Sequence, residues 1–156
     1  MFSRVYRFVP LAILLSCLGP VYAQKGDKPA FKAGPTQASL ARKGAFSAVS
    51  ASDASVKSAL PATDLKKAKG KLNKTATFTG TVTSIYAPKN GKRVLLDFAP
   101  DFKTAVIGLV DDANFKTFPD LKQLKGKKVL VSGKVIAFKE QTQVELTSPT
   151  SIKLVK

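Results

Sequence analysis

Several short segments of the chain combine positive charges with aromatic or amide side chains. Lysine and arginine can pair with phosphates, and aromatic rings can stack on bases, so this combination suits a strand of nucleotides. The candidate binding residues are Tyr86, Lys89, Lys92, Arg93, Phe102, Lys103, Phe138, Lys139, Gln141 and Gln143. A structural alternative stays open, in which Phe102 and Phe138 fill the interior and the lysines only keep the surface soluble.

The residue types needed for most enzyme chemistry are scarce. The sequence has no histidine, which removes the commonest general base and the commonest zinc ligand. Its adjacent acidic pair, Asp111 and Asp112, is explained by a helix start, where carboxylates face the positive end of the helix dipole. No loop has the oxygen-ligand spacing of a calcium site. We therefore expect a protein that is not an enzyme, with no catalytic residue, no metal and no cofactor.

The charge balance predicts an anionic partner. The chain has 26 basic and 10 acidic residues, for a formal net charge of +16, and such a field attracts anionic polymers. A separate basic run could grip phosphates or an anionic membrane surface, although a solvated helix face explains it more simply. This run consists of Lys66, Lys67, Lys69, Lys71 and Lys74. We expect single-stranded nucleic acid or another polyanion as partner, with membrane contact less favoured and any protein partner unknown.

Residues 1–23 have the pattern of a secretory signal peptide. Arg4 and Arg7 precede the apolar run Phe8–Leu18, and Val21–Ala23 fits the cleavage positions. Cleavage after Ala23 would remove Cys17, the only cysteine, and leave a mature chain without disulfides. This combination predicts a bacterial periplasmic or extracellular location. Two alternatives stay open: an uncleaved anchor, or lipidation at Cys17.

The rest of the chain divides into a linker, a short helix and a β domain. Residues 24–60 are rich in alanine, serine and lysine, which predicts a flexible linker, with a short helix capped by Asp53 near its end. Residues 61–73 predict a second short helix that begins near Asp64 and carries Leu65, Ala68 and Leu72 along one side. Residues 74–156 contain the β pattern.

Alternating apolar residues predict five strands in the β domain. The expected ranges are Thr75–Ala87, Arg93–Phe98, Thr104–Val110, Lys127–Phe138, and finally Gln143–Thr147 with Ser151–Val155. A helix between Asp111 and Gly126 separates the third strand from the fourth. This order is the layout of a mainly β, five-stranded OB-fold Greek-key barrel. Its expected core residues are Phe78, Val82, Val94, Leu96, Phe98, Ile107, Leu109, Phe115, Phe118, Leu124, Val129, Val131, Val135 and Leu146.

The β domain resembles exported bacterial OB-fold proteins of the nucleic-acid-binding type. The resemblance rests on Thr79–Val82, Val94–Phe98, Ala105–Ile107, Leu124–Val135 and Gln143–Leu146. It implies a barrel like those used in tRNA-anticodon recognition and single-strand binding, and OB barrels also bind proteins, sugars and small molecules. The sequence departs from single-strand binders in one respect, because its outward positions on the second and third strands carry no aromatic residue. An exported protein that binds another anionic polymer, a lipid headgroup or a protein is therefore the alternative function.

Overall fold

The computed structural model describes residues 44–88 and 91–156. The expected signal peptide, residues 24–43 of the expected linker and Lys89 lie outside the described residues. Within the described part, no helix is long and apolar enough to cross a membrane.

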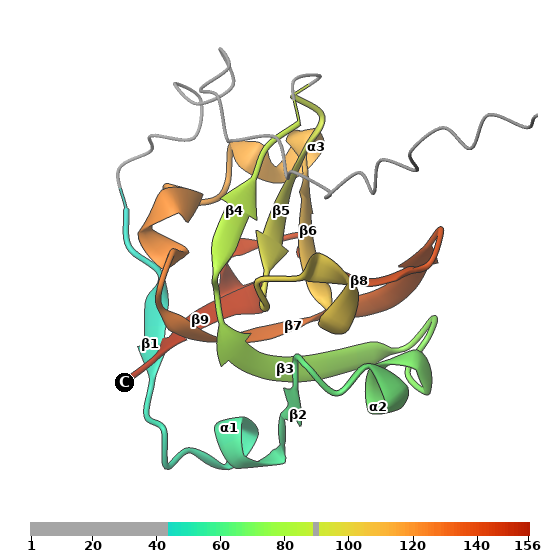
Figure 1. The fold of residues 1–156 in the computed structure, drawn as a ribbon. Coiled ribbons are helices and arrows are strands. Elements are labelled where there is room, and N and C mark those ends of the chain that lie inside the picture. Colours follow the sequence, from blue (N-terminus) through green and yellow to red (C-terminus); the bar gives the residue numbers. More distant parts are fainter. Residues whose placement is uncertain (1–43, 89–90) are drawn as a thin grey trace, which may run out of the picture. The chain divides into compact units, whose positions relative to one another are not determined.

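Strands dominate the described chain, and its helices are short (Figure 1). The strands are β1 (Ser47–Val49), β2 (Leu60–Pro61), β3 (Thr75–Thr81), β4 (Ser84–Tyr86), β5 (Arg93–Asp97), β6 (Ile107–Asp111), β7 (Lys128–Phe138), β8 (Gln141–Glu145) and β9 (Ile152–Val155). The α-helices are α1 (Ala54–Ser58), α2 (Leu65–Lys69) and α3 (Asp112–Phe115). Single turns of 3-10 helix are η2 (Phe102–Thr104), η3 (Leu121–Leu124) and η4 (Pro149–Ser151).

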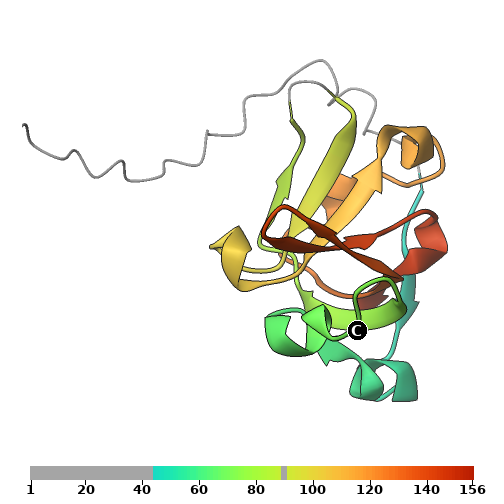
Figure 2. The same cartoon turned by 90° about the vertical axis from the view of Figure 1, so that its right-hand side faces the viewer.

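The strand pairings run around one core in an open order, from β3 through β7, β8, β6 and β5 to β4. Antiparallel pairs join β3 to β7, β7 to β8, β6 to β5 and β5 to β4, while β6 and β8 are parallel. Because β4 follows β3 after only Val82 and Thr83, the sheet curls back toward β3. Figures 1 and 2 show this curl from two directions. The architecture is mainly β with few helices, and it is compatible with an OB-like fold.

The alternation predicted for the first strand is present in β3. Phe78 is fully buried and pairs with Val131, while Thr75 and Thr81 on the other face are exposed. Gly80 lies on the Phe78 side, where a Cβ atom would come within 2.9 Å of the Phe98 ring and 3.0 Å of the Ala62 Cβ. Glycine at this position therefore allows the strand to pack directly against both side chains.

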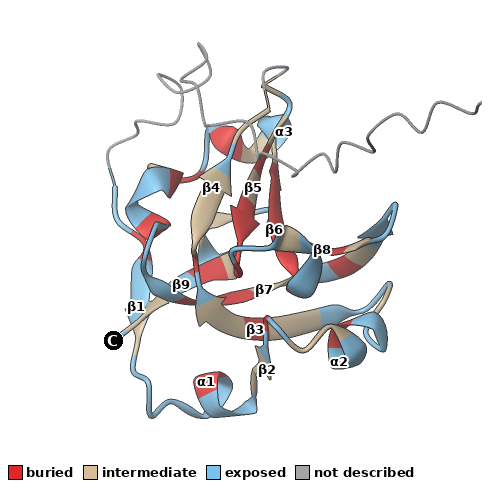
Figure 3. Cartoon of the chain, in the orientation of Figure 1, coloured by how far each residue is buried: buried red, intermediate tan, exposed pale blue. Residues whose placement is uncertain are grey.

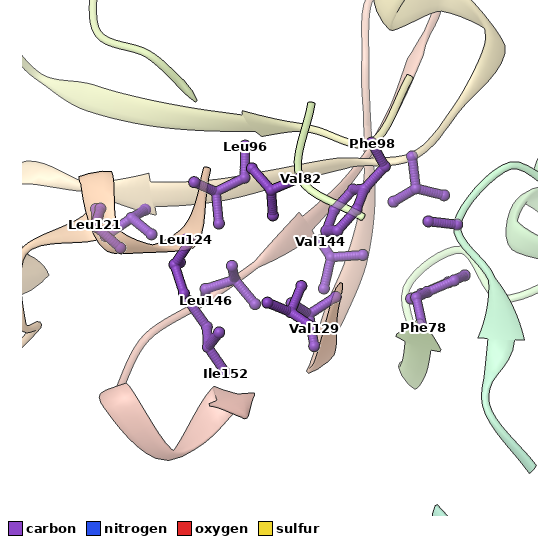
Figure 4. Close-up of a cluster of buried hydrophobic side chains, with 14 of the residues drawn as sticks. Phe78, Val82, Leu96, Phe98, Leu121, Leu124, Val129, Val144, Leu146 and Ile152 are labelled. Carbon is purple, nitrogen blue, oxygen red and sulfur yellow. The ribbon is translucent and has the colours of Figure 1, made fainter. Parts of the chain in front are cut away.

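Every residue expected in the core is buried, but the expected inward face of the third strand is wrong (Figures 3 and 4). The central apolar cluster contains Val106 and Val110 rather than Ile107 and Leu109. A Cβ atom on Gly108 would lie 3.1 Å from Leu146 Cδ1, so the even-numbered positions face the core. Because apolar residues occupy both faces of this strand, alternation in the sequence cannot tell the faces apart.

Part of the expected linker is folded. β1 pairs in parallel with β9, β2 pairs with β3, and Phe46 is buried in the central cluster. The short helix capped by Asp53 is confirmed as α1. Residues 44–60 therefore belong to the folded domain, which was expected to begin near residue 61, because short strands at the edges of the sheet need little apolar sequence of their own.

Other element bounds also differ from the expectation. α2 is confined to Leu65–Lys69, and Pro61 belongs to β2. The helix expected between Asp111 and Gly126 is present as two short pieces, α3 and η3, which lie on either side of Pro119. The expected last strand is two strands, since β8 pairs with β6 and β7 whereas β9 pairs with β7 and β1.

Candidate nucleic-acid interface

The β7–β8 hairpin exposes an aromatic ring at its tip. Phe138 and Gln141 form its last cross-strand pair, and Lys139 follows with a positive φ of 55°. A backbone in this left-handed region reverses the chain tightly, although lysine seldom adopts it. Phe138 keeps 43% of its surface exposed. The hairpin thus presents a large apolar ring to solvent next to a cation.

Two cations lie close to the Phe138 ring. The Arg93 guanidinium carbon is 5.4 Å from the ring centroid, and the Lys139 Nζ is 5.8 Å from it. These distances are within the range of cation–π attraction. Arg93 begins β5 and pairs with Asp111 of β6. The fold therefore brings Arg93 close to the Phe138 ring, although the two residues are far apart in the sequence.

A groove lies beside this hairpin. It has a volume of about 990 Å³ and is bordered by α2, the η2 turn and the hairpin tip. Its lining residues are Leu65, Lys69, Leu72, Phe102, Lys103, Ala105, Ala137, Phe138, Lys139, Glu140, Gln141 and Thr142. Figure 1 shows α2 and the hairpin tip at the same end of the sheet. The groove has an apolar and aromatic lining, three lysines from three different elements, and one acidic residue.

The structure gathers five of the expected site residues in the groove and leaves others outside it. Phe102, Lys103, Phe138, Lys139 and Gln141 all line the groove. Arg93 does not line it but contacts Phe138. The exposed Tyr86 and Lys92 are not among its lining residues.

Gln143 is not a surface residue, contrary to the sequence-based expectation. Its side chain is only 2% exposed, because β8 runs between β6 and β7 and its neighbours across the strands are Ile107 and Ile136. Gln143 Nε2 donates a hydrogen bond to Gln141 Oε1 at 3.2 Å. Gln143 therefore supports Gln141 from within the sheet instead of meeting a ligand.

Sequence reasoning missed α2 as a wall of the groove. Leu65, Lys69 and Leu72 line it, whereas Lys66, Lys67 and Lys71 of the same basic run do not. The signal was available, since Lys69 is four residues after Leu65 and three before Leu72, and such positions share one face of a helix. A lysine on the apolar side of a short helix can reach a ligand that lies on that side.

Hydrogen bonds to carboxylates organise α2 and α1. The backbone N–H of Lys67 donates to Asp64 Oδ1 at 3.1 Å and its ammonium lies 3.1 Å from Asp64 Oδ2, and this backbone bond and then the side-chain bond lower the pKa of Asp64. The side-chain and backbone bonds from Ser55 lower the pKa of Asp53 in the same way. Lys67 is thereby held on its own helix.

Across residues 44–88 and 91–156, no group of three or more acidic, histidine or cysteine residues could hold a metal ion.

Comparison with known proteins gives only distant structural similarity. No protein-family model and no curated protein matches the chain. Among solved structures, an aspartyl tRNA synthetase from Entamoeba histolytica is 17% identical with a TM-score of 0.48, and the match covers 73% of this chain and 26% of the synthetase chain. An OBody bound to hen egg-white lysozyme is 17% identical with a TM-score of 0.37, over 55% of this chain and 81% of that one. The chain thus spans about a quarter of the synthetase chain it resembles.

Proposed function

We propose that this protein is an OB-fold binding module for single-stranded nucleic acid. The observation that carries the proposal is the exposed Phe138 ring, which has both Arg93 and Lys139 within about 6 Å of its centre and lies at the edge of a groove with further lysines. Aromatic faces stack on bases of any sequence, and neighbouring cations neutralise the phosphates between them.

The net charge supports the same class of partner. The chain carries a formal charge of +16, so a long anionic polymer would be attracted before any specific contact forms. The groove adds an apolar surface that a phosphate alone does not require. A ligand that alternates flat rings with negative charges satisfies both features.

The direct test replaces the exposed ring. Phe138→Ala should lower affinity for a labelled single-stranded oligonucleotide by about 5- to 150-fold, since stacking one base contributes about 1–3 kcal/mol. Phe138→Tyr keeps an aromatic face and is the matched control, so it should bind nearly as well as the unmodified protein. Fluorescence anisotropy at low salt measures both variants. Equal affinity of Phe138→Ala and the unmodified protein would contradict the proposal.

The second candidate function is binding of a different anion by an exported protein. The abundance of lysine favours it, because a lysine ammonium attracts any anionic group and reads no base. Competition of labelled single-stranded DNA with a sulfated polysaccharide and with vesicles that contain anionic lipid separates the two candidates. The competitors are compared at equal concentrations of negative charge. If the polysaccharide or the vesicles displace the labelled DNA at a lower concentration of negative charge than unlabelled DNA does, the second function is favoured.

We also propose that the protein acts outside the cytoplasm of a bacterium after cleavage following Ala23. The basic start and apolar run of residues 1–23 support this proposal. Mass spectrometry of the exported protein should find Gln24 at the N-terminus. A lipid-modified mass that begins at Cys17 would instead indicate membrane attachment.

A further inference from the structure

The Arg93 contact and the groove share one residue, Phe138. Phe138 and Lys139 line the groove, and Phe138 is also the ring that Arg93 approaches at 5.4 Å. Arg93 itself lies outside the groove lining. The hairpin tip therefore joins two cationic regions, one at the start of β5 and one beside α2.

The groove beyond the tip has the chemistry of a continued track. Lys69 of α2 and Lys103 of η2 add cations from separate elements, and Leu65, Leu72 and Phe102 provide apolar surface between them. Lys69 and Lys103 are both exposed, so their ammonium groups are accessible to a ligand. Cations around an apolar surface match a chain in which phosphates and bases alternate.

Of the lysines in α2, only Lys69 lines this groove. Lys66 and Lys67 are exposed on the same helix but do not line the groove, and Lys67 is paired with Asp64. Lys69 and Lys66 therefore carry the same charge but differ in position. A ligand that occupies the groove should lose more affinity when Lys69 is replaced than when Lys66 is replaced. A diffuse electrostatic field would not distinguish them.

We propose that the nucleic-acid strand runs from Arg93 past the hairpin tip into the groove, with Lys69 as a phosphate contact at its far end. This inference rests on the proposed function and assigns a binding role to α2, which the sequence alone placed outside the site. A single OB-type domain covers about 4–16 nucleotides, so a track longer than one base is consistent with its size.

The first experiment compares Lys69→Ala with Lys66→Ala, using fluorescence anisotropy with labelled oligothymidylate across a salt series. Lys69→Ala should weaken binding by about two- to fivefold, as expected for one exposed ion pair. It should also reduce the slope of log affinity against log salt by about 0.7, the value for one phosphate contact on a single strand. Lys66→Ala should change both quantities less, and Lys69→Arg should restore them.

A second variant fills the groove without changing charge. Ala137 is exposed and lines the groove, so Ala137→Leu should obstruct it. Thr147→Leu adds a leucine at an exposed position that does not line the groove, and it should leave affinity unchanged. Thermal unfolding followed by circular dichroism checks that both variants fold.

The outcomes separate this inference from the proposed function. If Lys69→Ala and Ala137→Leu match their controls while Phe138→Ala loses affinity, the groove is unoccupied and the inference is overturned, but the proposed function stands. If the unmodified protein does not bind the oligonucleotide even at low salt, the proposed function fails and the inference fails with it. Losses with Lys69→Ala and Ala137→Leu that their controls do not show, together with a loss with Phe138→Ala, support the track.

Discussion

The Arg93 guanidinium carbon lies 5.4 Å from the centre of the Phe138 ring, although the two residues belong to β5 and β7, which do not pair with each other. The contact links the start of the β5 strand to the tip of the β7–β8 hairpin. Cation–π attraction at an exposed site contributes about 0.5–1 kcal/mol. In the proposed function, an arginine that already restrains the ring would lower the entropy cost of stacking a base on it.

A double-mutant cycle tests this link without a ligand. Arg93→Ala and Phe138→Ala should each destabilise the fold slightly, and the double variant should lose less than their sum by about 0.5–1 kcal/mol. Denaturant unfolding of the four proteins measures this coupling. Additive effects within about 0.3 kcal/mol would show that the two side chains are neighbours without a stabilising interaction.

Gly133 is a position where even one methyl group should be harmful. A Cβ atom there would lie 2.0 Å from the Glu145 carbonyl oxygen of β8, and backbone cannot move aside as a flexible side chain can. Gly133→Ala should therefore destabilise by about 3 kcal/mol or more, the upper end of overpacking costs. Gly70→Ala is the control, since Gly70 has a φ of −67° that alanine adopts easily. An equal midpoint of urea unfolding for the two variants would contradict the expected clash.

The caps of α1 and α2 predict a loss of stability in acid. Asp53 and Asp64 have pKa values lowered below 3.8 by hydrogen bonds from Ser55 and Lys67, respectively. A lowered pKa means that the folded state favours the charged carboxylate, so its stabilisation is present above the unfolded pKa of about 3.9 and is lost as pH falls through the folded pKa.

Asp53→Asn and Asp64→Asn isolate this contribution, because asparagine also caps helices but carries no charge. Each variant should melt below the unmodified protein at neutral pH, and the difference should shrink as pH falls below about 4. A difference in melting temperature that persists undiminished at pH 3 would show that the deficit does not come from the charge.

Local rules predicted much of this fold, whereas contacts between distant segments decided the rest. The alternation around Phe78 and the caps at Asp53 and Asp64 depend on neighbouring residues, and the sequence indicates them directly. The burial of Gln143 and the inward face at Val106 depend on which strands lie beside β6 and β8. The spacing of apolar residues within one strand does not show which other strands pack beside it.

The candidate site divides in the same way. Its residue types at Phe138, Lys139 and Lys103 were predictable, because cations next to aromatics in loops already indicate a binding surface. Phosphate binding by the basic run that contains Lys69 was only the less simple interpretation, because the place of Lys69 in the groove depends on where α2 lies beside the hairpin. Its spacing from Leu65 and Leu72 was a local signal, but only the fold shows that this apolar side borders a groove.

The folded segment before residue 61 contributes to the core of the domain. Phe46 is 5% exposed and belongs to the central cluster, and Gln123 Nε2 donates a hydrogen bond to the neighbouring Gly44 carbonyl at 3.0 Å. Phe46→Ala should therefore destabilise the domain by about 3–5 kcal/mol, as for other buried phenylalanines. Ser47→Ala is the matched control, since Ser47 is exposed in β1 and should change stability by less than about 0.5 kcal/mol. Urea unfolding measures the free energy of unfolding of both variants. A loss below about 1 kcal/mol for Phe46→Ala would show that this segment adds little to the folded domain, as expected for the flexible linker that its composition suggests.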